Sequence, residues 1–459
     1  MSFRRGSGVS AAISVLATIA IFGSQQAPAA AASRNAVVSP TVSTTGSNYV
    51  PLSPSVRILD TRNGHHPLGP GAVLPLQVTG TSAGVPTGAS AVVINVTAVF
   101  GTRSSYLTVY PAGPSRPTAS NVNFPPGIVL ANLVTSGLSS GGAVDIYNNV
   151  GTVDVLGDVE GYFMPEPVTV TSGEYTPIPP IRVCDSRFGQ PINLCNGLND
   201  GKSHTIGPNT AVKVTVAGQP AWCAPSCGPT IPTDGTEEFA IINLTAIAGT
   251  ANTFLSVVPW TTNGCTYGGS KGQPPFSTVS VNAGQAQANR VFVDLGINTN
   301  PINVCIYNAA GKANYIVDDD GWFGGPTAGQ AEQFTAAATP TRICDTRQGL
   351  GTQCQGHELG KFGVLKVAAA GQNGIPTSAE AVIANLTAVG GTAGTYISAY
   401  PSDAPARPNV SDINVAPGQT LANLTAITLS ASGPAGDFNL FNDLGNINAV
   451  VDVEGWFHP

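Results

Sequence analysis

Hydrophobic and polar residues alternate along this chain with a period of two, in short runs that are typical of β-strands. In AVVINVTAV, the side chains that share one face belong to Val92, Ile94, Val96 and Ala98. In TVDVLGDVEGYF, one face carries Val153, Val155, Val159 and Phe163, and the other carries Asp154, Leu156, Asp158, Glu160 and Tyr162. Successive side chains of a strand point to opposite faces, so both runs predict strands with one apolar face.

Turn-forming residues separate these runs at short intervals. YLTVYPAG and AVDIYNN are further short strands that end at Gly, Pro or Asn. About seven or eight strands per repeated unit at this spacing predict an all-β protein of antiparallel β-sandwiches, jelly-roll-like or immunoglobulin-like. Immunoglobulin topology lacks support, because the first unit has no Cys and the usual Trp between paired cysteines is absent. A β-trefoil is the alternative, although it needs roughly twelve strands per unit.

Five phrases recur three times in the same order, which makes internal repetition the dominant signal. The opening phrase is RILDTR (Arg57–Arg62), then RVCDSR (Arg182–Arg187), then RICDTR (Arg342–Arg347). The next three phrases contain Asn95, Asn243 and Asn385, then Asn132, Asn289 and Asn423, then Asn148, Asn308 and Asn442. The closing phrase is DVEGYF, DDDGWF or DVEGWF, and ends at Phe163, Phe323 and Phe457.

The repeats divide the chain into three β modules, which we expect at residues 50–165, 175–325 and 333–459. Residues 166–174 and 326–332 are predicted linkers, and residues 33–49 are a predicted flexible lead-in rich in Ser and Thr. Modules of this length can each hold a core of their own. We therefore expect three independent beads on a string, and not a closed ring of repeats.

The N-terminal residues and the net charge indicate the location of the protein and exclude some classes of partner. Residues 1–32 combine Arg4 and Arg5, an apolar run and an alanine-rich stretch, which is typical of a secretory signal peptide. A membrane anchor is the alternative, but the apolar run is short for a spanning helix and no later run is long enough. The net charge of −7 argues against nucleic acid or an anionic membrane as partner. We expect an exported, soluble protein, extracellular or on the cell surface.

The eight cysteines fit an oxidising compartment. Cys184 and Cys195 flank a loop in the second module, and Cys344 and Cys354 flank the corresponding loop in the third, so Cys184–Cys195 and Cys344–Cys354 are the best-supported disulfides. The other four belong to the second module, and we pair them as Cys223–Cys227 and Cys265–Cys305, although four cysteines allow three connectivities. A zinc site at Cys223 and Cys227 is the competing interpretation.

The order of the phrases, with Arg116-Pro117 and Asn123 between the second and third, resembles a module common in exported actinobacterial proteins. There it occurs alone, in tandem or appended to enzymes. The resemblance covers nearly all of the mature chain and implies export and an extracellular β-rich fold, with no established activity. The second module departs most, because it lacks the Arg-Pro phrase, inserts PAWCAPSCGPT and has Asp320 in place of Glu.

The repeated charges suggest an ion lock, since only 10% of the residues are charged yet each module repeats the same five ionic positions. We expect guanidinium groups of the opening phrase to meet carboxylates of the closing phrase and to join the first and last strands of each module. The predicted lock comprises Arg57, Asp60, Arg62, Asp158 and Glu160, then Arg182, Asp185, Arg187, Asp318 and Asp320, then Arg342, Asp345, Arg347, Asp452 and Glu454.

The alternative use of the closing phrase is a binding face. An aromatic ring beside carboxylates can stack on a sugar while the carboxylates accept hydrogen bonds from its hydroxyls. The candidate ligand-facing aromatics are Tyr162, Trp322 and Trp456. Three modules would raise a weak affinity for a polysaccharide or cell-wall glycan by avidity.

Catalysis is the weakest of the three interpretations, and we assign no catalytic residue, metal or cofactor. Asp158 and Glu160 could serve as the acid and base of a glycoside hydrolase, but an arginine partner would hold both ionised. No histidine position is shared by all three modules, and no GxSxG, HExxH or phosphate-binding motif occurs. The sequence predicts a secreted, non-catalytic protein for adhesion or for binding carbohydrate or cell envelope. The alternatives are a structural envelope spacer and a glycan-active hydrolase, and the oligomeric state stays open.

Overall fold

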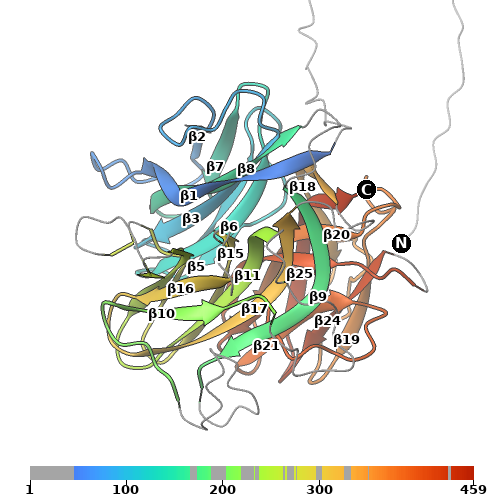
Figure 1. Ribbon diagram of the computed structural model, residues 1–459. Helices are drawn as coiled ribbons and strands as arrows, with labels where there is room; N and C mark the ends of the chain where they lie inside the picture. The colour runs from blue at the N-terminus through green and yellow to red at the C-terminus, as the bar shows by residue number, and fades with distance from the viewer. Residues whose placement is uncertain are drawn as a thin grey trace, which may run out of the picture. The chain divides into compact units, whose positions relative to one another are not determined.

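The computed structural model describes residues 46–165, 173–187, 203–218, 232, 237–261, 264–265, 273–274, 276–295, 302–324, 332–349, 351–432 and 436–459. These residues form strands, turns and loops, so the predicted all-β class is confirmed. Among them, no helix is both long enough and apolar enough to cross a membrane. The three modules follow one another along the colour scale of Figure 1, from blue through green to red.

Each module contributes one consecutive set of strands. Module 1 contains β1 (Ser47–Asp60), β2 (Val73–Gln77), β3 (Ala91–Val99), β4 (Ser105–Pro111), β5 (Val122–Phe124), β6 (Val129–Gly137), β7 (Ala143–Asn148) and β8 (Asp154–Pro165). Module 2 contains β9 (Glu174–Asp185), β10 (Thr210–Thr215), β11 (Glu237–Ala248), β12 (Thr253–Thr261), β13 (Gly264–Cys265), β14 (Val279–Val281), β15 (Ala286–Asp294), β16 (Asn303–Asn308) and β17 (Ala313–Gly324). Module 3 contains β18 (Gln333–Asp345), β19 (Val364–Ala368), β20 (Ala381–Val389), β21 (Thr395–Pro401), β22 (Ile413–Val415), β23 (Thr420–Thr428), β24 (Asp437–Asn442) and β25 (Asn448–His458).

The strand pairing in module 1 is that of a jelly roll. The antiparallel pairs are nested, with β1 beside β8, β2 beside β7, β3 beside β6 and β4 beside β5. This nesting gives one set of strands in the order β6-β3-β8-β1, which continues through a contact of β1 with β18 into an eight-stranded sheet with module 3, and a second sheet in the order β2-β7-β4-β5. Two facing sheets of this kind form a β-sandwich, and the nested order selects the jelly roll from the predicted topologies and excludes the β-trefoil.

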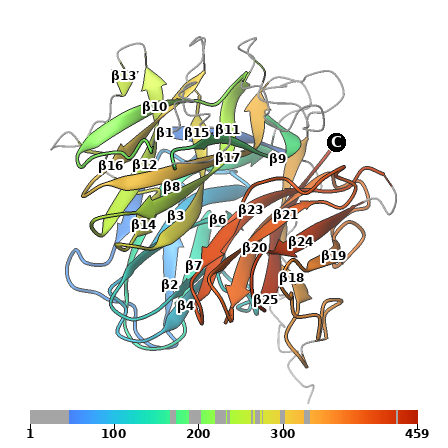
Figure 2. The same ribbon diagram turned by 90° about the horizontal axis from the view of Figure 1, so that it is seen from below.

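The other modules repeat this arrangement. Module 3 has sheets in the order β23-β20-β25-β18 and β19-β24-β21-β22, and its strands are well separated in Figure 2. Module 2 has β15-β11-β17-β9 facing a sheet built from β10, β16 and β12, in which β14 pairs with β12 and β13 extends the end of β12.

A β-bulge near the end of the last strand reverses which side chains face the core. Along β8, Gly161 pairs with Val93 and Val159 pairs with Ile94, so Glu160 is an extra residue in its strand. An extra residue shifts the alternation by one. The predicted faces of this strand were therefore wrong beyond Glu160. Tyr162 packs against the sandwich interior, and Phe163 points to the opposite side. The same shift occurs at Asp320 and Glu454 in the other modules.

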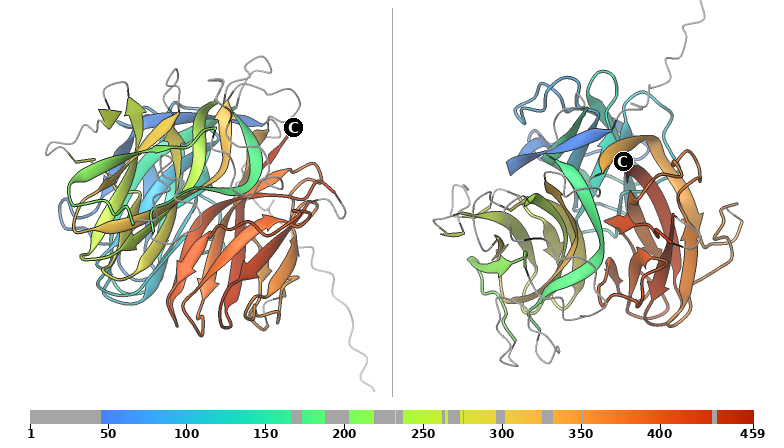
Figure 3. Two further views of the ribbon diagram at one scale, coloured as in Figure 1. Left: turned by 60° about the horizontal axis from the view of Figure 1, so that its bottom comes forward. Right: turned by 45° about the vertical axis from the view of Figure 1, so that its right-hand side comes forward.

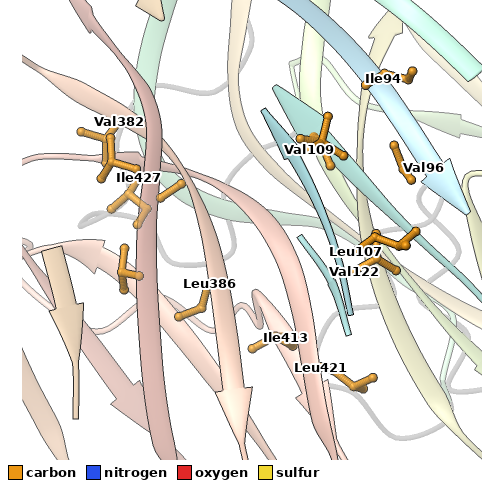
Figure 4. Close-up of a cluster of buried hydrophobic side chains, with 14 of the residues drawn as sticks. Ile94, Val96, Leu107, Val109, Val122, Val382, Leu386, Ile413, Leu421 and Ile427 are labelled. Carbon is orange, nitrogen blue, oxygen red and sulfur yellow. The ribbon is translucent and has the colours of Figure 1, made fainter. Parts of the chain in front are cut away.

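Aliphatic side chains fill the space between the two sheets of each module. Figure 4 shows part of this packing, with side chains from module 1 such as Ile94 and Leu107 and side chains from module 3 such as Val382 and Leu386. The interior of module 2 is a separate cluster that includes Ile242, Val257 and Val304.

A further core lies between the modules, so the expected beads on a string are wrong. Residues Pro40–Pro459 form one unit, whose modules meet through the faces that the bulges redirect. The ring centroids of Phe163, Phe323 and Phe457 lie 6.4, 6.3 and 6.0 Å apart, one ring from each module. Three nearly equal separations indicate an approximate threefold arrangement. Figure 3 shows the three modules from two further directions.

The first strand of each module closes this arrangement in a cycle. The ring of Tyr49 lies 4.9 Å from Phe323, Tyr175 lies 4.3 Å from Phe457, and Phe334 lies 4.1 Å from Phe163. Each first-strand aromatic therefore packs on the last strand of a neighbouring module. Backbone hydrogen bonds also connect the start of each module to the start of the next. Tyr49 N donates to Gly173 O at 3.0 Å, and Tyr175 N donates to Glu332 O at 2.8 Å.

The glycine of the closing phrase makes room for these rings. A Cβ atom at Gly161 would overlap the ring of Tyr49, and one at Gly455 would overlap the ring of Phe334. The repeated Gly is therefore required by the close approach of an aromatic ring to the backbone.

Candidate functional site

The first arginine of each opening phrase pairs with the first acid of the closing phrase in the same module. Arg57 lies directly opposite Asp158 across β1 and β8, and its Nε and Nη2 donate to the two carboxylate oxygens at 2.7 and 2.9 Å. The corresponding distances are 2.8 and 3.3 Å for Arg182–Asp318 and 2.8 and 3.0 Å for Arg342–Asp452. These two-pronged contacts join the first and last strands of each jelly roll.

The second arginine of the opening phrase has a local partner. Arg62 binds Asp60 with two hydrogen bonds of 2.9 and 2.7 Å, and Arg187–Asp185 and Arg347–Asp345 repeat this geometry. The hydrogen bonds from Arg62 lower the pKa of Asp60 below its usual value. These pairs shape the turn after the first strand and do not reach the closing phrase.

The last acid of the closing phrase does not belong to the predicted ion lock. Glu160, Asp320 and Glu454 are the bulge residues, so their side chains leave the sheet of their own module. Glu160 Oε2 accepts a hydrogen bond from Phe292 N in module 2 at 3.2 Å. Glu454 accepts from Asn121 Nδ2 at 2.6 Å and from Thr135 N at 2.8 Å, both in module 1. The prediction that these three carboxyls pair with arginines of the opening phrase was wrong, because a bulge redirects them, and Asp320 instead pairs with Arg290 on β15 of its own module.

Burial at the module interface disfavours the ionised form of these carboxyl groups. Burial raises the pKa of Glu160 to about 8, against a smaller lowering by the hydrogen bond from Phe292. Burial also raises the pKa of Glu454 well above its usual value. A carboxyl in such a place is favoured in its neutral form, because burial removes the water that would stabilise its charge.

Two sets of three asparagines form hydrogen bonds across the junctions between modules. The side-chain amides of Asn95, Asn243 and Asn385 donate to the carbonyl oxygens of Ser277, Ser411 and Ser120 at 2.6, 2.7 and 2.6 Å. The amides of Asn132, Asn289 and Asn423 donate to the side-chain oxygens of Asn385, Asn95 and Asn243 at 2.9, 3.0 and 3.1 Å. Every one of these bonds crosses from one module to another. The repeated Asn phrases therefore supply buried polar groups that are paired across the junctions, although each amide of the second set also donates to a backbone carbonyl of its own module.

The junction between modules 2 and 3 differs from the others, because it contains a buried arginine. Arg290 replaces the leucine found at positions 133 and 424, and it is only 1% exposed. Its Nε lies 2.5 Å from Asp320 Oδ2, and its Nη2 contacts Asp412 of module 3 and donates to Thr425 at 3.0 Å. The equivalent junction between modules 3 and 1 holds Leu424, Glu454 and Asn121. The two junctions therefore differ at all three equivalent positions.

Comparison of the repeats could have found two members of this triad, but not the third. Arg290 was visible as an exception in the ANRV phrase, and Asp320 was noted as a departure, but Asp412 attracts no attention without the fold. Sequence alone does not reveal that these three positions meet, because they lie on β15, on β17 and before β22.

The three candidate aromatics have different surroundings. Trp322 is 5% exposed and packs in the core of module 2, so its assignment to a ligand-facing surface was wrong. Tyr162 and Trp456 are half-buried against the interior of their modules. Tyr162 and Trp456 do not share a face with the acids of their phrases, because the bulge lies between them.

Trp456 nevertheless opens onto a pocket. The pocket has a volume of about 560 Å³, and its lining includes Thr341, Asn373, Ser378 and His458. Thr335 stands opposite Trp456 across β18 and β25, and its hydroxyl lies 2.8 Å from His458 Nε2. The pocket therefore combines one indole ring with hydroxyl, amide and imidazole groups, and it contains no carboxylate among its described residues.

Two disulfides lie within the described residues. Cys265–Cys305 joins β13 to β16, and Cys344–Cys354 closes the loop after β18. Cys184 is also disulfide-bonded, and its predicted partner Cys195 lies outside the described residues, as do Cys223 and Cys227. No group of three or more His, Cys, Asp or Glu side chains suited to a metal ion occurs in the part of the chain that the structure describes.

Comparison with known proteins adds little to this picture. No family model and no curated protein matches the chain. Among solved structures, a chain from the atomic structure of Sulfolobus Turreted Icosahedral Virus is similar over 88% of this chain and 91% of its own, at 10% identity and a TM-score of 0.15. A score this low carries no argument about fold or function.

We predict that the strand-joining ion pair of module 2 contributes strongly to stability. Arg182→Ala leaves Asp318 buried without its partner, and we expect the free energy of unfolding to fall by about 3–5 kcal/mol. Arg62→Ala is the matched control, because the Arg62 side chain is 47% exposed and surface pairs contribute about 0–1 kcal/mol. Equal losses in chemical denaturation would contradict the assignment.

The Arg290 triad predicts a loss that two further changes reverse. Arg290→Leu leaves Asp320 and Asp412 without a cation, and we expect a loss of about 3–5 kcal/mol in the free energy of unfolding. The triple variant Arg290→Leu, Asp320→Glu, Asp412→Asn reproduces the residues of the junction between modules 3 and 1, and it should recover most of that loss. A triple variant no more stable than the single one, by calorimetry, would refute the correspondence.

The raised pKa of Glu160 predicts that stability decreases as pH rises. The folded protein binds this proton more tightly than the unfolded chain, so the contribution is complete below about pH 4.5 and is lost as pH passes about 8. Glu160→Gln keeps a neutral side chain with an acceptor for Phe292, and melting temperatures between pH 5 and 9 should fall less steeply than in the parent. Glu358→Gln, at an exposed carboxylate, is the control and should leave the slope unchanged.

Proposed function

We propose that this is an exported, non-catalytic protein that binds carbohydrate or cell envelope, and that the Trp456 pocket is its binding site. The pocket is the observation that carries the proposal. Ligand pockets commonly have volumes of roughly 300–1,000 Å³ and a few polar groups beside an aromatic ring. The volume of about 560 Å³ falls in that range, and Asn373 and Ser378 are exposed at its border.

The chemistry of the lining favours a sugar. An indole face is suited to the apolar face of a pyranose ring, and the polar atoms around it can exchange hydrogen bonds with hydroxyl groups. His458 and Thr335 already contact each other, which orients the imidazole at the edge of the pocket. This arrangement differs from the aromatic and carboxylate pair expected from the sequence, since the polar partners come from β18 and the loop after β19.

The placement of the carboxyls supports a non-catalytic role. Hydrolysis of a glycoside requires two carboxyl groups beside the scissile bond. The acids of the closing phrases are buried, and they bind arginines, backbone N–H groups or amides. We therefore do not extend the proposal to glycan cleavage.

The disulfides, together with the signal peptide predicted from the sequence, support an extracellular location. Disulfides persist in oxidising compartments, and the two described pairs close loops of module 2 and module 3. A structural spacer of the envelope is the second candidate, and the shared core of the three modules favours it, because such a unit resists bending between its modules.

The test is binding of the intact protein to a panel of soluble polysaccharides, measured by affinity electrophoresis and calorimetry. We expect at least one polysaccharide to bind, and Trp456→Ala to weaken that binding about tenfold or more, which corresponds to about 1.4 kcal/mol. Trp260→Ala is the matched control, because Trp260 is half-buried on β12 in module 2 and lies outside the pocket. Binding that survives Trp456→Ala unchanged would exclude this pocket, and no retention by any polysaccharide would favour the spacer.

A further inference from the structure

We propose that the Trp456 pocket is one half of a longer site, which crosses β18 and holds a linear, neutral oligosaccharide between modules 3 and 1. This inference rests on the proposed function and specifies its ligand. It predicts that the protein recognises several consecutive sugar rings, and not a single terminal residue.

A second pocket adjoins the first. It has a volume of about 310 Å³, and both pockets are lined by Thr335, Ala337 and Ala338 of β18. The other wall of the second pocket belongs to module 1, where it includes Thr87, Ser140 and Gly141. The two pockets therefore lie on either side of the same short segment of one strand.

The path of β18 explains why this segment is accessible. Its pairing with β25 is regular up to Ala336 and resumes at Thr341, so the intervening residues leave the sheet. On its other side, β18 pairs with β1 only where Ser47 meets Phe334. The segment between the pockets thus has one edge directed at module 1 without a regular ladder. Ala338 is exposed in this segment, whereas Ala336 is half-buried and Ala337 is buried.

The lining has the chemistry of a neutral polymer site. Apart from His458, the described residues that line either pocket carry no ionisable group. Arginines and acids lie nearby, in the ion pairs that join the first and last strands. Hydroxyl groups and glycine-rich backbone are complementary to sugar hydroxyls. Among these described residues, a polyanion would find no fixed cation and a cationic ligand would find no carboxylate.

Only the assembled molecule has this site, because one wall comes from module 1 and the other from module 3. The junction between these modules is held by Glu454, Asn121 and Thr135. Packing of the modules therefore creates a binding surface that no single module possesses.

The experiment measures affinity against chain length by calorimetry, with neutral cello-, xylo- and manno-oligosaccharides from disaccharide to hexasaccharide. For the series that binds, we expect the hexasaccharide to bind about tenfold or more tightly than the disaccharide. Ser140→Trp fills the second pocket, and it should lower the hexasaccharide affinity to that of the disaccharide while leaving disaccharide binding unchanged. Ser115→Trp is the control at an exposed serine outside both pockets.

The outcomes separate the two proposals. Affinity that depends on Trp456 but not on chain length or on Ser140→Trp would overturn the extended site and leave the proposed function intact. Tighter binding of oligogalacturonates than of any neutral series would also overturn it. If no oligosaccharide and no polysaccharide binds, the proposed function and this inference both fail.

Discussion

One extra residue in the last strand of each module determines how the molecule is built. Without the bulge at Glu160, Phe163 would face the interior of its own sandwich, together with Val155 and Val159. With the bulge, Phe163 faces the neighbouring modules, and Tyr162 takes the place inside. Because the same insertion occurs at Asp320 and Glu454, three rings meet in one shared core. The bulge converts a strand with one apolar face into a strand that contributes to two cores.

The buried charges follow from the same geometry. Residues before the bulge, such as Asp158, remain in register with the first strand and meet an arginine there. The bulge residue itself is aimed at another module, where Glu160 finds only a backbone N–H group. Desolvation is costly for a carboxylate in such a place, so the group is held neutral by its raised pKa, or, in module 2, a guanidinium accompanies it. The two kinds of acid in one short phrase thus serve different partners.

The sequence could predict the fold class because alternation and turn residues act locally. Period-two patterns, three sets of repeated phrases and regular turns led to β-sandwich modules, which the structure confirms as jelly rolls. Comparison of the repeats also singled out the ionic positions, and the structure places Arg57, Arg182 and Arg342 opposite acids of the closing phrase. The faces of Tyr162 and Phe163 could not be predicted, because a bulge leaves no mark in the hydrophobic pattern of its own strand. The packing of modules on one another was missed for a related reason. Asn95 and Asn132 look like ordinary polar positions on a strand until a second module supplies their partners.

The chemical difference between the junctions has a consequence for how such a chain reaches its final form. Similar repeats on one polypeptide can undergo domain swapping with the equivalent repeats of another molecule. Such swapping produces misassembled oligomers during synthesis. A leucine at positions 133 and 424 would allow either surface to accept several neighbours, whereas the guanidinium of Arg290 is tolerated only where Asp412 receives it. A wrong neighbour would leave Arg290 with Asp320 of its own module but without Asp412, so the buried triad would be incomplete. One polar exception among otherwise similar repeats can thereby determine which module packs against which.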